Sequence, residues 1–398
     1  MKRSDNGAAM APLLEVKGIT KRFPGVLALD KVDLQVGVGE VHGLVGKNGA
    51  GKSTLMKILM GLESPDAGQM ALNGEPLTDM NPYRAKMLGI AYVPQEAQLV
   101  GPLTVGENIF CGELPIGRLG FVRWEEVHRQ AAGMLDRLGQ RIETHLKVED
   151  LSVGQRQVVS IAKALFAGAC LIILDEPTAP LTRREVETLF DLVRSLKGEG
   201  VSFIYISHYL GEVFEVCDDV TVLRNGRHMA TRPVSSLTEP ELARLMVGGE
   251  VEQAERSSVT IGEPVLTVRG FSKAGRFEDV SLEVHEGEIT GLTGLAGCGK
   301  SELALAIFGL DPPDSGEIYL NGRRLEISTP AEAFREGIAY LPEDRHKHGL
   351  VPGRSVAQNI TLAILRQICD RLGFIDGREE RAVARRFQDA LEIMTPTL

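Results

Sequence analysis

The sequence predicts an α/β protein built from two related domains. Residues 46–53 (GKNGAGKS) and 294–301 (GLAGCGKS) both fit the pattern G-x-x-x-x-G-K-[ST], and they lie 294 − 46 = 248 residues apart. Continuous apolar runs at 171–174 and 201–206 are typical of central parallel strands that are covered on both faces. A glycine-rich loop of this pattern connects a buried strand to a helix. We therefore expect the same unit of strand, loop and helix twice.

The extent of the repeat sets the domain boundaries. Beyond the two loops, residues 64–68 (SPDAG) recur at the same offset as residues 312–316 (PPDSG). Self-similarity over such a distance indicates homologous domains rather than a solenoid of short repeats. We expect a first domain at 12–249 and a second domain at 264–398, joined by a polar, aperiodic linker at 250–263.

The elements of the first domain follow from hydrophobic patterning. Alternation at 32–36 (VDLQV) predicts a half-exposed strand of an antiparallel sheet. The apolar run at 41–45 predicts the strand before the first loop, and residues 53–59 (STLMKIL) open the helix after it. Apolar residues at helical spacing predict a further helix at 127–138, and the same spacing recurs at 383–394 in the second domain.

Composition argues against several classes of protein. An apolar content of 43% and a charged content of 25% are ordinary for a folded globular protein. A net charge of −10 gives no support to nonspecific binding of nucleic acid, so we expect no nucleic-acid partner. The five cysteines are scattered and lack C-x-x-C spacing, which favours a reducing compartment without a disulfide framework or a zinc site.

Neither a membrane span nor a signal peptide is expected. Lys2 and Arg3 precede polar residues rather than an apolar stretch. Residues 158–174 approach the length of a membrane span, but Gly168 interrupts them, and they are more typical of a buried helix followed by a buried strand. A role at a membrane would therefore come through a partner.

The repeated loop carries the chemistry of phosphate binding. Its glycines let backbone N–H groups turn towards a phosphate at the positive end of the following helix. Lys52 is expected to neutralise the β- and γ-phosphates of a nucleotide, and the Ser53 hydroxyl to bind Mg²⁺. A chance match in a glycine-rich loop is the alternative. The candidate nucleotide-binding residues of the two loops are Gly46, Lys47, Asn48, Gly49, Ala50, Gly51, Lys52, Ser53, Thr54, Gly294, Gly297, Gly299, Lys300 and Ser301.

Further polar residues follow apolar segments that predict buried strands. Asp175 and Glu176 come directly after 171–174; the first is a candidate ligand of Mg²⁺, and the second is a candidate to orient or deprotonate the attacking water. Gln95 is expected to reach the metal and the water, and His208 to contact the γ-phosphate. Because the carboxyl ends of parallel strands meet at one edge of a sheet, these side chains are expected to converge. The alternatives are a solvated acidic turn and a structural histidine.

Residues 151–155 (LSVGQ) form the most specific motif, which we call the signature motif. Ser152 and the amide of Gly154 stand at a predicted helix N-terminus, which is a second site for an anion, and Gln155 completes the motif.

Together with Ile-Leu-Asp-Glu-Pro-Thr and Ile-Ser-His further along the chain, this motif resembles the motif set of ATP-binding cassette (ABC) ATPases. The resemblance implies that the chain binds and hydrolyses ATP with Mg²⁺. It also places Phe23 where this family stacks an aromatic ring on adenine, although a core phenylalanine would look the same.

The resemblance covers nearly the whole chain and points to one branch of the family. Residues 103–109 (LTVGENI) and 175–182 (DEPTAPLT) are similar to the tandem-cassette ATPases of bacterial carbohydrate importers, the ribose, galactose and xylose type that includes the autoinducer-2 importer. In the second half, 341–345 (LPEDR) is a marker of this type, and Glu343 stands where the first half has Gln95. The resemblance implies a peripheral ATPase at the cytoplasmic face of the bacterial inner membrane. It also implies integral membrane permease subunits as partners and a periplasmic solute-binding protein as an indirect partner.

The second half departs from this pattern in its length. The first loop and the signature motif start 151 − 46 = 105 residues apart, so a second signature motif is expected at about 294 + 105 = 399, past residue 398. We therefore expect an incomplete second domain and a homodimer through the first domains, because cassette ATPases pair the loop of one domain with the signature motif of another. The alternatives are a soluble tandem-cassette ATPase acting on ribosomes or DNA, which the acidic linker argues against, and a non-catalytic remnant. No residue here specifies the solute.

Overall fold

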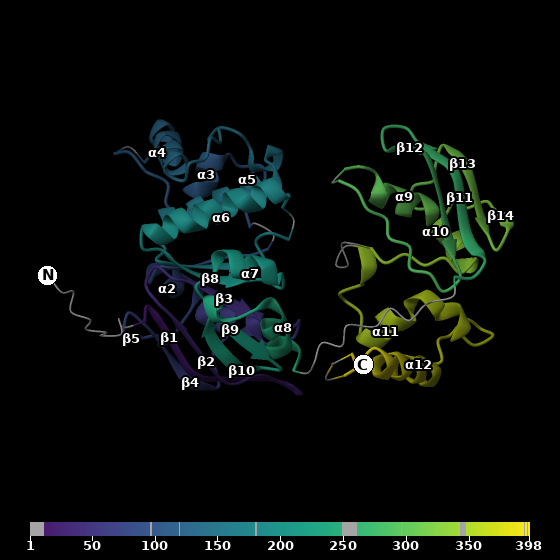
Figure 1. Cartoon of the computed structure of the whole chain (residues 1–398), viewed down its shortest axis with the longest axis horizontal. Coiled ribbons are helices and arrows are strands. Elements are labelled where there is room, and N and C mark those ends of the chain that lie inside the picture. The colour runs from purple at the N-terminus through teal and green to yellow at the C-terminus, as the bar shows by residue number, and fades with distance from the viewer. Residues whose placement is uncertain are drawn as a thin grey trace. The chain divides into compact units, whose positions relative to one another are not determined.

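The computed structural model divides into two compact units, Met1–Val251 and Glu252–Leu398 (Figure 1). The structure describes residues 12–95, 98–118, 120–179, 181–248, 261–295, 297–342, 348–393, 395 and 397–398. Most of the predicted linker at 250–263 lies outside these residues, and so does Glu343.

Unit 1 consists of two sheets and eight helices among its described residues. Its strands are β1 (Leu14–Phe23), β2 (Val26–Val36), β3 (Val41–Val45), β4 (Ala67–Leu72), β5 (Glu75–Pro76), β6 (Ile90–Val93), β7 (Leu171–Asp175), β8 (Ser202–Ile206), β9 (Asp219–Arg224) and β10 (Arg227–Pro233). Its helices are α1 (Lys52–Leu59), α2 (Pro82–Met87), α3 (Val105–Ile109), α4 (Trp124–Arg137), α5 (Val153–Phe166), α6 (Arg183–Gly198), α7 (Leu210–Val216) and α8 (Glu239–Val247), with short 3-10 turns at η1 (Val148–Asp150) and η2 (Val234–Ser236).

The larger sheet of unit 1 places the candidate residues on one edge. Its strand order is β10-β9-β3-β8-β7-β6, and every neighbouring pair is parallel except β9 and β10. The strands β3 and β8 are buried along their whole length, as is β7 up to Leu174, which confirms the central strands predicted from the apolar runs. Since these strands are parallel, the residues that follow β3, β6, β7 and β8 emerge at the same edge of the sheet.

The smaller sheet is antiparallel, in the order β2-β1-β4-β5, and confirms the strand predicted from the alternation at 32–36. The hydrophobic residues of its inner face share one core with α1 and with the larger sheet. This core includes Leu14, Ile19, Leu34, Leu44, Leu55, Ile58 and Ile204. The apolar face of α1 is therefore held between the two sheets, which fixes the helix that begins at the first loop.

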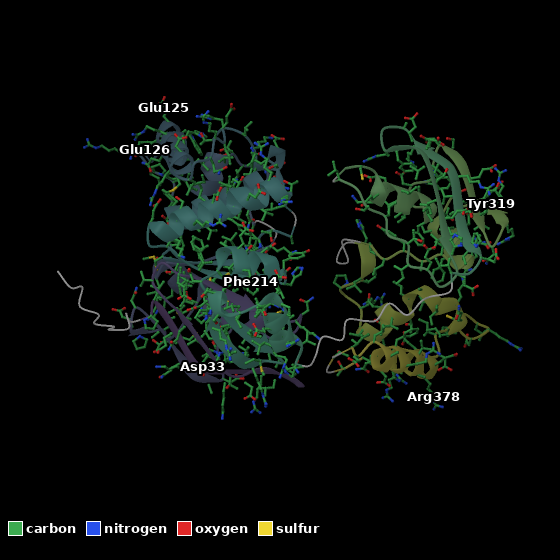
Figure 2. All side chains as sticks on the ribbon, viewed as in Figure 1. Asp33, Glu125, Glu126, Phe214, Tyr319 and Arg378 are labelled. Atoms are coloured by element: carbon green, nitrogen blue, oxygen red, sulfur yellow. The ribbon has the colours of Figure 1, made fainter. Side chains whose placement is uncertain are left out.

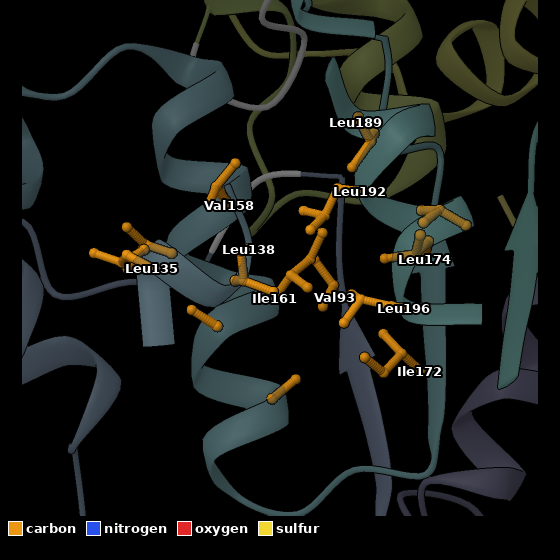
Figure 3. Packing of buried hydrophobic residues seen from close by; sticks show 14 of the residues in the cluster. Val93, Leu135, Leu138, Val158, Ile161, Ile172, Leu174, Leu189, Leu192 and Leu196 are labelled. Atoms are coloured by element: carbon orange, nitrogen blue, oxygen red, sulfur yellow. The ribbon is translucent and has the colours of Figure 1, made fainter. Parts of the chain in front are cut away.

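A second core joins the helical part of unit 1 to the other face of the larger sheet. Figure 3 shows residues of α4, α5, α6, β6 and β7 meeting in it, among them Leu135, Val158, Ile161, Val93, Leu192 and Ile172. The apolar run at 158–174 divides into α5 and β7, as predicted. The first turn of α4 carries Glu125 and Glu126 (Figure 2), whose charges favour a helix N-terminus. Within the described ranges, no helix combines the length and the apolar character needed to cross a bilayer.

Unit 2 begins with an antiparallel sheet of the same order as the smaller sheet of unit 1, here β12-β11-β13-β14. Its strands are β11 (Pro264–Lys273), β12 (Phe277–His285), β13 (Ser315–Leu320) and β14 (Arg323–Leu325). Its helices are α9 (Lys300–Ile307), α10 (Pro330–Arg335), α11 (Val356–Thr361) and α12 (Gly377–Ala390), with the 3-10 segment η4 (Leu362–Gln367). The second loop leads into α9 as the first leads into α1.

Two apolar segments of unit 2 are described without strand structure. Residues 289–293 and 338–341 occupy the repeat positions of β3 and β6. In unit 1, β3 pairs with β8 and β9, and β6 pairs with β7. Among the described residues of unit 2, the sheet is the antiparallel one, β12-β11-β13-β14, and neither segment pairs with a strand. Ile289 is 99% exposed and Leu341 is 84% exposed. The parallel sheet predicted for each domain is therefore found in unit 1, whereas the described part of unit 2 shows the antiparallel sheet.

The helix predicted at 383–394 ends earlier than its pattern suggests. Helix α12 stops at Ala390, and Leu391 beyond it is exposed. Ala384 is buried in α12, but Phe387, on the predicted apolar face, is exposed. Helical spacing therefore identified the element, but not which side chains it buries, because burial depends on what packs against the helix.

Candidate nucleotide-binding site

The first loop connects β3 to α1 at the carboxyl edge of the larger sheet. Gly46 has no room for a side chain, because a Cβ atom there would lie 2.3 Å from the carbonyl oxygen of Leu223. Gly51 caps α1 with a φ of 103°, which side-chain-bearing residues rarely adopt. Ala50 is buried under the loop. Three residues at the tip of the loop are exposed: Lys47, Asn48 and Gly49.

Lys52 closes this loop from its first helical position. Its side chain is 7% exposed, and its Nζ donates hydrogen bonds to the carbonyl oxygens of Gly46 (2.7 Å) and Lys47 (3.2 Å). Burial lowers the pKa of Lys52, while the nearby carboxylates of Glu176 and Asp175 raise it. The ammonium group of Lys52 therefore binds the loop carbonyls, and the carboxylates of Glu176 and Asp175 lie close to it.

Asp175 ends β7 and is half-buried at the same edge. Its Oδ2 accepts a hydrogen bond of 2.7 Å from the hydroxyl of Tyr92 on β6. Burial is the main cause that raises the pKa of Asp175, and Glu176 adds to it, whereas the Tyr92 hydrogen bond and Lys52 oppose the rise. Sequence reasoning missed Tyr92, which lies on the strand that precedes the predicted Gln95.

Glu176 and His208 come together as predicted. His208 Nδ1 lies 3.1 Å from Glu176 Oε1, and the backbone N–H of Glu176 donates to the carbonyl of Ile206 at 2.9 Å. Glu176 has a φ of 47°, a left-handed conformation that is uncommon outside glycine. His208 is exposed and its ring lies against Tyr209, with 4.1 Å between the ring centroids. The carboxylate therefore faces the open edge of the sheet with an imidazole beside it.

Glu212 on α7 supports both loops that carry these residues, and sequence reasoning missed it. Its Oε1 accepts a hydrogen bond from the hydroxyl of Thr178 (2.6 Å), and its Oε2 accepts from the hydroxyls of Tyr205 (3.0 Å) and Ser207 (2.8 Å). All three donors are buried. Glu212 therefore ties the loop after β7 to the loop after β8 and fixes the spacing of Glu176 and His208.

Some predicted site residues do not contact the cluster formed by Lys52, Asp175, Glu176 and His208. Ser53 is exposed and Thr54 is half-buried in the first turn of α1. Gln95 is exposed after β6, and it makes no hydrogen bond to Lys52, Asp175 or Glu176 in the described part of the chain. Phe23 is half-buried where β1 ends, with Lys21 Nζ 5.2 Å from its ring centroid.

The signature motif forms the N-terminus of α5. Ser152 caps the helix: its Oγ accepts from the N–H of Gln155 (3.2 Å), and its own N–H donates to Gln155 Oε1 (3.0 Å). The Ser152 hydroxyl donates to Glu185 of α6 at 3.1 Å, a contact that sequence reasoning also missed. Gly154 lines the same pocket as Ser152, and none of the described loop residues 46–53 lines it. The fold therefore does not place the signature motif on the first loop of the same unit.

The second loop repeats the lysine contacts of the first. Lys300 Nζ donates to the carbonyls of Gly294 (2.5 Å) and Leu295 (3.1 Å), and it lies 3.6 Å from Cys298 Sγ. Gly299 caps α9 with a φ of 93°. A Cβ atom there would lie 2.7 Å from the carbonyl oxygen of Arg276, which connects β11 to β12. Gly297 also has a left-handed φ, of 77°, and Ser301 is exposed.

A glycine loop between a parallel strand and a helix, closed by a buried lysine and facing two strand-end carboxylates, defines a P-loop nucleotide-binding domain. A family model described as ABC transporter matches residues 29–179 and 277–393. The chain therefore belongs to the ABC transporter family, and it is an ATP-binding cassette ATPase.

Curated relatives and solved structures agree with this family. The chain is 46% identical over 390 residues to a ribose import ATP-binding protein of Rubrobacter xylanophilus, which covers 98% of this chain and 78% of that protein. It is 41% identical over 385 residues to a putative ribose/galactose/methyl galactoside import ATP-binding protein of Hahella chejuensis, with 96% and 75% covered. It is also similar to the crystal structure of an ATP-binding cassette of an ABC transporter in its ADP conformation, with a TM-score of 0.53 and 30% identity over 60% of this chain and 100% of that one.

Proposed function

We propose that this chain hydrolyses ATP to power the import of a sugar or sugar-like solute. Hydrolysis is supported by the convergence of Lys52, Asp175, Glu176 and His208 on one edge of the parallel sheet. Sugar import is supported by the relatives named as ribose or galactoside import proteins, which match this chain over nearly its whole length. We further propose that residues 12–249 and 264–398 are two cassette domains joined by a linker.

Each residue of the site has a distinct role in this proposal. Lys52 exchanges its loop carbonyls for oxygens of the β- and γ-phosphates, and the backbone N–H groups of residues 46–54 bind the same phosphates. Glu176 accepts a proton from water as the water oxygen attacks the γ-phosphorus, and the bond from that phosphorus to the ADP oxygen breaks. His208 holds Glu176 and contacts the γ-phosphate. Phe23 stacks on the adenine.

The donor atoms at the site fit Mg²⁺. The Ser53 hydroxyl, the Asp175 carboxylate and the Gln95 amide oxygen are hard oxygen ligands, which Mg²⁺ prefers. No cluster of three or more acidic, histidine or cysteine side chains suited to a metal occurs in the described ranges. Mg²⁺ usually keeps waters and substrate phosphates as further ligands. The ion neutralises charge on the phosphates when it is bound.

The proposed assembly places the chain at the cytoplasmic face of a bacterial inner membrane, bound to integral permease subunits. A periplasmic solute-binding protein delivers the solute to those subunits. Because Ser152, Gly154 and Gln155 do not lie on the first loop of their own unit, we propose that first domains pair between two chains. The signature motif of one chain then meets the nucleotide on the other. In the second loop, Lys300 and its neighbours bind phosphate in the same way as Lys52.

Two substitutions and one growth assay test the function. Lys52→Ala is expected to abolish hydrolysis and to weaken ATP binding strongly, whereas Glu176→Gln retains binding and slows turnover at least about a hundredfold. In bacteria deleted for the ATP-binding protein of their ribose, galactose or xylose importer, the unchanged chain should restore growth on at least one of these sugars, and Lys52→Ala should not. Unimpaired hydrolysis by Glu176→Gln would contradict the assigned roles. Failure to restore growth on ribose, galactose or xylose would contradict sugar import.

A further inference from the structure

Glu185 lies between the N-termini of two helices that belong to different functional segments. Its Oε2 accepts from the N–H (3.0 Å) and the hydroxyl (2.8 Å) of Thr182, which caps α6. Its Oε1 accepts from the hydroxyl of Ser152, which caps α5, at 3.1 Å. Helix α6 follows the loop that carries Glu176, and α5 begins with the signature motif. One carboxylate therefore joins the two segments.

This carboxylate occupies the donors that the proposed function assigns to a phosphate. The Ser152 hydroxyl already accepts from the Gln155 N–H, and its single hydrogen is given to Glu185. The pKa of Glu185 is lowered chiefly by the Thr182 N–H, against the opposing effect of burial. The hydroxyls of Thr182 and Ser152 and, least, the Gly154 N–H lower it further. A Cβ at Gly154 would lie 2.6 Å from Glu185 Oε1, so the carboxylate packs directly on this glycine. A phosphate oxygen cannot use these hydrogens while Glu185 holds them.

The pocket beside Glu185 contains a buried donor that has no partner among the described residues. The pocket has a volume of about 500 Å³, and its lining includes Ser152, Gly154, Gln157, Arg184 and Glu185. Gln157 is 3% exposed, and its Nε2 makes no hydrogen bond to any residue that the structure describes. An unpaired buried amide is unfavourable, and an acceptor that entered this pocket would satisfy it.

We propose that Glu185 is a displaceable internal anion of the signature motif. In the chain without nucleotide it binds Ser152 and Gly154 in place of a phosphate. When the γ-phosphate of a nucleotide on a partner cassette takes these donors, the Glu185 carboxylate moves into the pocket and accepts a hydrogen bond from Gln157. Because Glu185 also holds Thr182, this movement reports the arrival of the phosphate to the loop that carries Glu176. The inference rests on the proposed pairing of cassettes.

The first test removes the charge and keeps the shape. Glu185→Gln presents an amide that accepts fewer hydrogen bonds and carries no charge, so a phosphate displaces it more readily. Glu241 provides a matched control, because it caps α8 through the N–H and hydroxyl of Thr238, both at 2.8 Å, away from the signature motif. All variants are made in the Glu176→Gln chain so that ATP persists. The measurement is the ATP concentration at half-maximal self-association, by sedimentation velocity at fixed protein and Mg²⁺ concentrations.

The expected result is a midpoint that is about tenfold lower in Glu185→Gln, since bonds to a charged acceptor are about twice as strong as neutral ones. Glu241→Gln should stay within about twofold of the parent, because exposed capping contacts away from the interface do not compete with phosphate. Direct ATP binding to the isolated chain should be the same in all three, because Glu185 does not face the first loop.

The second test removes the proposed acceptor site for the displaced carboxylate. Gln157→Met has a similar volume and no polar atom, so it should fold at least as stably as the parent. It should raise the ATP midpoint several-fold, and it should have no effect in the Glu185→Gln chain, where no charged group needs the site. Such non-additivity indicates direct energetic coupling between two residues.

The outcomes separate this inference from the function on which it rests. Equal midpoints for Glu185→Gln and the parent would overturn the displacement proposal and leave ATP binding intact. Additive effects of the two substitutions would overturn the role of Gln157. ATP binding without self-association in any variant would also overturn the proposal, because displacement requires a phosphate held by a partner. Absence of ATP binding to the unchanged chain would instead contradict the proposed function itself.

Discussion

Replacing Glu212 by alanine is expected to destabilise unit 1 more than a typical surface substitution. Three buried hydroxyl groups, those of Thr178, Tyr205 and Ser207, donate to this one carboxylate. Burial and the neighbouring Glu212 raise the pKa of Tyr205, so its phenol stays protonated and remains a donor. With alanine at 212, all three donors lose this acceptor at once, and Ser207 retains only a contact of 3.5 Å with the carbonyl oxygen of Tyr209.

The magnitude follows from the number of stranded donors. Leaving a buried hydrogen-bonding group unsatisfied costs about 1–3 kcal/mol, so three donors at the low end give a loss of about 3 kcal/mol in the free energy of unfolding. Glu212→Gln keeps one acceptor oxygen and should cost about 1 kcal/mol. Glu215 on the same helix provides a control: it is exposed and paired with Arg194 at 3.3 Å, so Glu215→Ala should cost less than about 1 kcal/mol.

The chain carries its own probe for this measurement. Its single tryptophan, Trp124, begins α4 in unit 1, so intrinsic fluorescence in urea reports the unfolding of this unit. A loss of about 3 kcal/mol should lower the urea midpoint by about 1 M or more at typical slopes. The ATPase rate should fall as well, because the two loops lose their common support. A midpoint for Glu212→Ala within about 0.3 M of that for Glu215→Ala would refute the reasoning.

Three further outcomes are expected. Tyr92→Phe removes a hydrogen bond that holds down the pKa of Asp175, so that pKa rises and the acid limb of the ATPase pH profile moves to higher pH. Cys298 is exposed within the second loop, whereas burial raises the pKa of Cys170, so alkylation followed by mass spectrometry should label Cys298 first, and ATP should protect it. The ATPase rate per chain should rise with protein concentration, and Ser152→Arg should abolish it.

Each of these three predictions can be contradicted by a specific result. An acid limb that moves to lower pH in Tyr92→Phe would show that Asp175 is not the group that titrates there. Equal labelling of Cys298 and Cys170 would contradict the higher reactivity expected of Cys298, and no protection by ATP would argue against nucleotide binding at the second loop. A rate per chain that is constant on dilution, well below the concentration at which chains associate, would argue against a site shared between two chains.

Local patterns predicted the residues that follow strands, because strand ends are visible in the sequence. Apolar runs marked β7 and β8, and the polar residues directly after them had to emerge at one edge of a parallel sheet. Glu176 and His208 therefore met as expected. The positions of the loop glycines could also be predicted, because the motif has a fixed spacing and each glycine in it has a characteristic backbone conformation.

Partners from distant parts of the chain could not be predicted in the same way. Tyr92 lies 83 positions from Asp175, and Glu212 lies on a short helix with no motif of its own. Glu185 fits a capping pattern with Thr182, which predicts a local role and gives no sign of Ser152. The segment at 289–293 likewise depends on residues that are distant in the sequence. Its sequence favours a strand, but a strand forms only when a neighbour supplies hydrogen bonds.

The left-handed backbone at Glu176 limits how this protein can be made more robust. A residue with a side chain costs about 1 kcal/mol more than glycine in this conformation. Glycine at 176 would remove that cost and, in the same step, the carboxylate that we propose activates water. A laboratory selection for heat resistance alone would therefore enrich inactive chains, whereas growth on an imported solute would retain the strained acid. Engineering for thermal tolerance should hold position 176 fixed and score variants by turnover as well as by melting temperature.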